Sequence, residues 1–81
     1  MTIKPKDVNG EFVKKFRKDN DLSQYELANI LGVTQSAVAQ WEKGNKKING
    51  SAMVLISLLC DYPWVLTELY KYEIKGGYKN A

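Results

Sequence analysis

The stretch that most constrains this chain runs from Leu22 to Gly44 and reads LSQYELANILGVTQSAVAQWEKG. It contains two short amphipathic segments that meet at Gly32. Glycine suits the left-handed backbone position at which a helix ends, because it has no Cβ atom to clash. The stretch therefore predicts a helix, a tight turn and a second helix set at a steep angle to the first.

Side chains suited to capping mark the start of both helices. Ser23 and Glu26 have the spacing of a capping box, in which two side chains reciprocally bind backbone N–H groups of the first turn. Thr34 takes the corresponding position before the second segment. We therefore expect helices over about residues 23–31 and 34–43.

Apolar residues at helical spacing predict three further helices, and no alternation long enough for a strand is present. The first helix covers about residues 9–20, with Asn9 as its cap. The next is the strongly apolar segment 52–60, which we expect to be the central helix, with Ser51 as its cap. The last covers about residues 63–73. The chain is thus predicted to be a compact all-α domain of five helices.

The length of 81 residues, 44% of them hydrophobic, limits the chain to one domain with a modest core. We expect a flexible N-terminal arm over residues 1–8, the folded domain over residues 9–75 and a tail over residues 76–81. The apolar run is too short to cross a bilayer, and the basic start lacks the apolar stretch of a signal peptide. A cytoplasmic protein without a membrane partner is therefore expected.

The composition argues against an enzyme. The chain contains no histidine, which excludes a histidine metal site, a Ser-His triad and an imidazole base. The single cysteine, Cys60, lies in an apolar pattern and is expected in the core. Asp61 and Glu68 do not form a spaced acid pair. No cofactor or metal is expected, and the net charge of +3 is compatible with nucleic acid without being diagnostic.

In the Leu22–Gly44 stretch the sequence resembles the helix-turn-helix family of the phage lambda and 434 repressors and Cro proteins, the XRE-like family. The elements LSQ-x-x-LA, LGV and W-E-x-G stand in the family's register. The resemblance covers about residues 12–59 and implies a lambda-repressor-like DNA-binding domain. The continuation GSAMVLISLLCDYP looks more like small antitoxin-type and anti-CRISPR-associated repressors, whose last helices commonly pair two subunits.

The resemblance implies base-reading positions on the second helix of the motif. Gln35 matches the family glutamine of the reading helix, and its amide offers the donor and acceptor that adenine N6 and N7 require. Ser36 matches a position that reaches a base edge, and Gln40 lies about one turn further on the same side. Ala39 or Ala37 adds contact with a thymine methyl group. Outside the motif, each polar residue would be read as ordinary surface.

The resemblance also implies contacts to the DNA backbone. Gln24 matches the family glutamine that touches a phosphate and braces Gln35, and Thr34 is both a cap and a phosphate ligand. Positive charge gathers just beyond the reading helix, where we favour phosphate contact over a mere solubilising role. The residues of this group are Lys43, Asn45, Lys46 and Lys47. Asn49 stands where many family members carry proline, which leaves the path of this loop open.

Other residues near the motif are expected to hold it together. Arg17 and Glu42 match a family pair that joins the first helix to the end of the reading helix, so we expect a structural ion pair. Leu27, Leu31, Val38 and Trp41 are core residues by their spacing. None of these residues is expected to contact DNA.

One reading helix spans too few base pairs to select a genomic site, so a symmetric homodimer on an inverted repeat is expected. The predicted dimer surface is the aromatic last helix, unless its residues only complete the monomer core. This surface comprises Trp64, Leu66, Leu69, Tyr70 and Tyr72. We expect a sequence-specific repressor of transcription that binds double-stranded DNA at its own operon. The alternative is an antitoxin-type protein that binds a toxin, with DNA binding as autoregulation.

Overall fold

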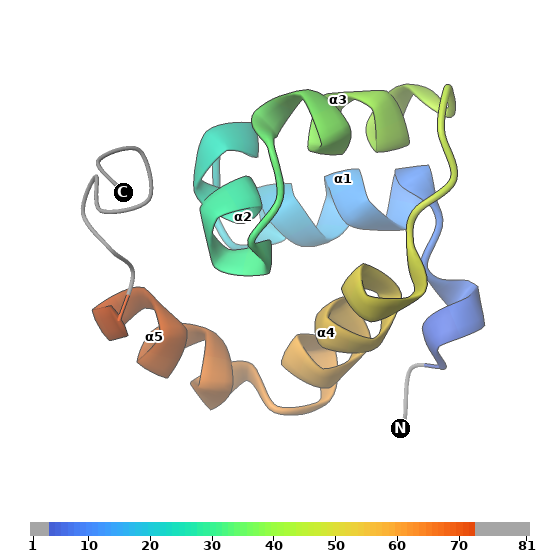
Figure 1. Cartoon of the computed structure of the whole chain (residues 1–81). Coiled ribbons are helices and arrows are strands. Elements are labelled where there is room, and N and C mark those ends of the chain that lie inside the picture. The colour runs from blue at the N-terminus through green and yellow to red at the C-terminus, as the bar shows by residue number, and fades with distance from the viewer. Residues whose placement is uncertain (1–3, 73–81) are drawn as a thin grey trace.

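Five α-helices build the domain, and a short 3-10 helix precedes them (Figure 1). The structure, a computed structural model, describes residues 4–72, with side chains through residue 69. No strand is assigned within this range, which confirms the expected all-α class. The elements are η1 (Pro5–Asp7), α1 (Gly10–Asp19), α2 (Gln24–Leu31), α3 (Gln35–Lys43), α4 (Gly50–Asp61) and α5 (Pro63–Tyr72).

The caps of α2 and α3 lie where the sequence places them. The Ser23 hydroxyl accepts from the Glu26 N–H at 3.0 Å, and the Ser23 N–H donates to Glu26 Oε1 at 2.8 Å. The Thr34 hydroxyl accepts from the Ala37 N–H at 3.1 Å. These bonds satisfy backbone donors that the first turn of a helix leaves without a partner. Both helices of the motif therefore start at defined residues.

α2 ends at Gly32, whose φ of 74° lies in the left-handed region. The Val33 N–H donates to the Ala28 carbonyl at 2.9 Å, as in a Schellman motif. α3 ends in the same way at Gly44, with a φ of 80°. The turn between the two helices comprises only the residues between Leu31 and Gln35, which keeps α2 and α3 packed side by side.

All five α-helices contribute buried apolar side chains to one core. Val38 and Trp41 of α3 face inward at 0% and 3% exposure, and α4 contributes more buried residues than any other helix. The side chains that are almost fully buried are Val13, Leu27, Val38, Ile56 and Leu59. The core thus fixes α3 from below and leaves its outer side at the edge of the molecule (Figure 1).

The N-terminal segment is more ordered than the flexible arm that we expected over residues 1–8. Pro5–Asp7 form η1, which packs against α4, and the side chain of Val8 is only 3% exposed. Burial of a valine side chain contributes about 1.5 to 3 kcal/mol to this packing. Residues 1–3 and 73–81, which include the expected tail, lie outside the described residues.

α4 starts with a different cap from the one that we predicted. Asn49 Oδ1 accepts from the Ala52 N–H at 2.9 Å, so the helix begins at Gly50 and our assignment of Ser51 as the cap is wrong. The Ser51 hydroxyl instead donates to Asn49 Oδ1 at 3.2 Å. Asparagine and serine are about equally good N-cap residues, so residue type alone does not show which of Asn49 and Ser51 caps the helix.

α4 and α5 meet at a bend of 113° just before Pro63, whose ring suits the first position of a helix. Within the described residues, no single helix is long and apolar enough to cross a membrane. α5 packs back onto α4 and buries Leu66 to 9% exposure. The C-terminal helix thus belongs in part to the monomer core.

Candidate nucleic-acid interface

α3 presents a polar face on the side opposite its buried residues. Residues at positions i, i+1, i+4 and i+5 share one side of a helix. The four residues predicted to read bases have this spacing, and we call them the reading face: Gln35, Ser36, Ala39 and Gln40. Gln35 and Ser36 are exposed, whereas Ala39 and Gln40 are half-buried. The structure therefore brings all four predicted readers onto one outward side of α3.

The two exposed members of the reading face lie in the first turn of α3. In helix-turn-helix proteins the N-terminal residues of the reading helix contact base edges. The Gln35 amide can donate and accept at once, which matches the adenine edge in the major groove. The Ser36 hydroxyl can do either and therefore discriminates less. The reading face has the chemistry to select one base strongly and a neighbouring base weakly.

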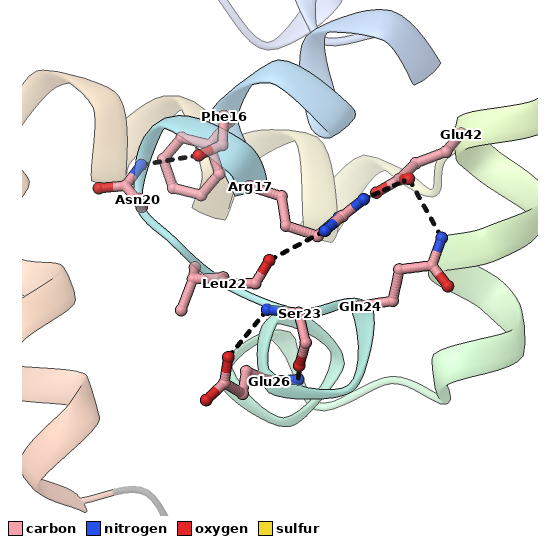
Figure 2. A network of polar contacts seen from close by, with 8 residues as sticks. All are labelled: Phe16, Arg17, Asn20, Leu22, Ser23, Gln24, Glu26 and Glu42. Carbon is pink, nitrogen blue, oxygen red and sulfur yellow. Dashed lines mark hydrogen bonds and ion pairs between the residues drawn. The ribbon is translucent and has the colours of Figure 1, made fainter.

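An ion pair fixes α3 to α1 (Figure 2). Arg17 Nε donates to Glu42 Oε2 at 2.7 Å, and Arg17 Nη2 donates to Glu42 Oε1 at 3.1 Å. The third nitrogen, Nη1, donates to the Leu22 carbonyl at 2.9 Å, so the same guanidinium also holds the chain just before α2. One arginine therefore connects all three helices of the motif region.

Gln24 joins this ion pair. Its Nε2 donates to Glu42 Oε1 at 3.1 Å, so the Glu42 carboxylate accepts from two side chains (Figure 2). We expected Gln24 to brace Gln35, and the bond in the structure runs to Glu42 instead. An ionised carboxylate is a stronger acceptor than a neutral amide, which accounts for the difference. An amide nitrogen carries two N–H groups, so a second donor exists for a phosphate oxygen.

The surroundings of Glu42 keep this network charged. Burial raises the pKa of Glu42, but the hydrogen bonds from Arg17 and Gln24 and the charges of Arg17 and Lys14 outweigh burial and lower it below 4.5. The hydrogen bond to Glu42 raises the pKa of Arg17, against the opposing effect of burial. Both groups are therefore ionised at neutral pH, so the ion pair joins α1 to α3 under these conditions.

The predicted phosphate ligands flank the reading face. Thr34 is exposed at the start of α3, and its hydroxyl, which accepts the capping bond, keeps an O–H donor. The others are exposed at the end of α3 and in the link to α4: Lys43, Asn45, Lys46 and Lys47. These lysines take part in neither the Arg17–Glu42 pair nor the Lys15–Asp19 pair. Donors thus lie at both ends of the reading helix.

The structure places a lysine of the N-terminal segment beside this loop. From the sequence, the N-terminal arm is able to reach DNA phosphates, but a solvated terminus is the preferred interpretation. Lys6 of η1 lines the same hollow as Lys46 and Lys47 of the link after α3. No periodicity or motif relates these positions, since the whole helix-turn-helix motif lies between them in the sequence. Only the long-range packing of η1 brings them together.

The residues predicted for a dimer surface are divided between core and exterior. Trp64 is 65% exposed, Leu69 is half-buried, and Leu66 is buried within one copy. The side chains of Tyr70 and Tyr72 lie outside the described residues. A surface on α5 within the described part of the chain therefore centres on Trp64.

No group of three metal-ligating side chains that could hold an ion is found within the described residues. Cys60 is half-buried against the core, and burial, together with the charge of Asp61, raises the pKa of its thiol. A thiol with a raised pKa is a poor nucleophile at neutral pH.

Comparison with known proteins points to the same region of the chain. Residues 13–66, more than half of the sequence, match the helix-turn-helix family model. The chain is 32% identical over 68 residues to the antitoxin MqsA of Escherichia coli K12, covering 84% of this chain and 52% of MqsA. It is 31% identical over 51 residues to the antitoxin PezA of Streptococcus pneumoniae serotype 4, covering 63% of this chain and 30% of PezA.

The chain thus spans about half of MqsA and less than a third of PezA. The family match covers α2 and α3 and includes the ion pair that holds them to α1. A helix-turn-helix domain of this type binds DNA and is not itself an enzyme. With the capped helices, the three-residue turn and the reading face all inside the match, the chain belongs to the XRE-type helix-turn-helix family.

Proposed function

We propose that the protein is a sequence-specific repressor of transcription that reads the DNA major groove with α3. The observation that carries this proposal is the reading face, which lies outward on a helix whose opposite side is locked into the core. Val38 and Trp41 anchor that inner side, and the Arg17–Glu42 pair fixes the end of the helix. A reading helix fixed in this way loses little conformational freedom when it binds.

We further propose that two copies bind as a symmetric dimer to an inverted repeat. One reading face covers only a few base pairs, and a dimer places two such helices about 34 Å apart, one turn of DNA. Four large apolar side chains that are 41% to 65% exposed support this proposal. They lie on α4, just after its last residue and at the start of α5, and we call them the junction patch: Val54, Leu58, Tyr62 and Trp64.

The junction patch has the character of a protein-binding surface. Val54 and Leu58 lie four residues apart on one side of α4, Tyr62 follows at its C-terminal end, and Trp64 lies in the first turn of α5. Large exposed apolar patches are unusual on a small monomer. Leu69, Tyr70 and Tyr72 of α5 extend the proposed surface. Leu66 is left out because it is buried in the monomer.

Such a dimer represses when its operator overlaps a promoter, because the bound protein excludes RNA polymerase. We propose its own operon as the target. Selection of bound duplexes from a random DNA pool, at a stated salt concentration, tests the proposal. The expected result is an inverted repeat with half-site centres about 10 base pairs apart. A single half-site would contradict the dimer, and a pool without enrichment would contradict sequence-specific reading.

A second candidate function is that of an antitoxin that binds a toxin protein. Both curated relatives are named antitoxins, and this observation favours the second candidate. The junction patch would then bind the toxin, with DNA binding as autoregulation. Co-expression with the product of the neighbouring gene tests this candidate. A stable complex that Trp64→Asp abolishes would support it, and a chain that purifies alone would oppose it.

A further inference from the structure

Three lysines from two distant parts of the chain line one open hollow beside the end of α3. Lys6 comes from η1, and Lys46 and Lys47 come from the link between α3 and α4. The hollow has a volume of about 390 Å³, and apolar side chains that include Val8 and Trp41 form part of its wall. It is therefore a basic recess with an apolar lining.

A close approach between α1 and α3 brings these segments together. A Cβ atom at Gly10 would overlap the carbonyl oxygen of Trp41, so α1 begins directly against the last turns of α3. η1 immediately precedes this contact and packs on α4. In Figure 1 the link that leaves α3 descends past η1 on its way to α4. Lys6 is thus held beside the link by packed backbone.

The recess has the electrostatic character of an anion site. All three lysines are exposed, and none takes part in the Arg17–Glu42 or Lys15–Asp19 pair. Clefts lined by one sign of charge with apolar walls concentrate the electric field and attract counter-ions. The anion that lies nearest to a reading helix seated in the major groove is a phosphate of the DNA backbone.

We propose that Lys6 is a DNA-backbone contact and completes, with Lys46 and Lys47, a phosphate clamp at the C-terminal end of α3. This inference rests on the DNA-binding function proposed above and adds η1 to the DNA-facing surface. Backbone contacts set the register of a protein on the duplex without reading sequence. The clamp therefore fixes the tilt of α3 in the groove at the end opposite Gln35.

Salt titration of DNA binding by full-length Lys6→Ala tests the clamp. The affinity is measured for the selected operator and for an unrelated duplex over a range of salt concentrations. Each lost phosphate contact reduces the slope of log K against log salt by about 0.9, so a dimer should lose about 1.8. The two DNAs should weaken by the same factor. Lys6→Arg should keep the slope of the wild type.

Lys18→Ala is the matched control, because Lys18 is an exposed lysine of α1 that does not line the recess. Its slope should equal that of the wild type. Lys6→Gln, which keeps most of the side-chain length, should reproduce Lys6→Ala, and equal unfolding temperatures would show that the fold is intact. A wild-type slope in Lys6→Ala, or a loss in Lys6→Arg equal to that in Lys6→Ala, overturns the clamp while DNA binding stands. Failure of the wild type to bind any duplex would overturn the proposed function itself.

Discussion

The guanidinium of Arg17 and the carboxylate of Glu42 form a two-bond ion pair across 25 residues of sequence, with side chains that are only 13% and 5% exposed. The pair therefore lies where water screens it poorly. Gln24 and the Leu22 carbonyl complete its hydrogen bonds. The end of the reading helix is held by charge as well as by apolar packing.

Removal of one partner of this pair should be costly. Glu42→Ala leaves the Arg17 guanidinium buried without its counter-charge, and we expect the free energy of unfolding to fall by about 3 kcal/mol or more. The control is Asp19→Ala, which breaks a pair whose side chains are 77% and 60% exposed and should cost less than about 1 kcal/mol. Urea denaturation measures both. Equal losses in the two variants would contradict the structural role of the buried pair.

The same pair predicts a dependence of stability on pH. The pKa of Glu42 in the folded protein lies below the usual 4.5, so its contribution is fully present above that value and is lost as pH falls through the folded pKa. The difference in unfolding free energy between wild type and Glu42→Gln should be constant near neutral pH and shrink in acid. Denaturation at a series of pH values measures it. A difference that persists unchanged to about pH 2 would contradict this assignment.

Mutations should distinguish a residue that reads bases from a residue that binds the DNA backbone. Gln35→Ala should cost about 1 to 3 kcal/mol per half-site and relax the preference at one base pair. Lys46→Ala should weaken all sequences alike and reduce the salt dependence. Competition between the operator and its single-base variants measures both. The two roles would be wrongly assigned if Gln35→Ala kept full preference while Lys46→Ala changed it.

The contact at Gly10 should be intolerant of any side chain. Gly10→Ala forces a Cβ atom against the Trp41 carbonyl, so α1 must shift away from α3, and we expect a loss of about 1 to 3 kcal/mol. Gly50→Ala is a matched control, since a Cβ at Gly50 meets nothing within 4 Å. It should be neutral or stabilise α4 by up to about 1 kcal/mol. Thermal unfolding distinguishes the two, and a neutral Gly10→Ala would show that the helices can separate without penalty.

Trp64 and Leu66 of α5 should affect different properties, namely dimerisation and the stability of the monomer. Trp64→Ala removes an exposed part of the junction patch and should raise the dissociation constant of the proposed dimer with little change in unfolding. Leu66→Ala empties a buried position and should reduce the unfolding free energy by about 2 to 5 kcal/mol. Sedimentation and denaturation separate these effects. A wild-type mass of one chain at micromolar concentration would rule out the dimer.

Much of the fold was predictable because its signals are local. The Ser23–Glu26 capping box and the left-handed turn at Gly32 act within a few residues, so the chain order alone reveals them. This reasoning fails at α4, where two capping residues lie two positions apart and Asn49 takes the role assigned to Ser51. Local signals fix where helices start but do not rank competing caps.

The features of this region that the sequence left undetermined depend on contacts between distant segments. Gln24 binds Glu42 because packing of α2 against α3 brings an amide to a charged carboxylate. Lys6 reaches the recess because Val8 is buried and η1 packs on α4. Neither contact leaves a period or spacing in the sequence. The family resemblance predicted the Arg17–Glu42 pair that supports α3, and the structure confirms it. The base-reading roles on α3 remain predictions of that resemblance.

The network around Glu42 has a consequence for the search along DNA. If the second N–H of the Gln24 amide binds a phosphate, that contact is connected through Glu42 to Arg17 of α1. We expect a helix held in this way to adapt little to a wrong sequence. Complexes on near-matched sites should then dissociate faster than the complex on the operator.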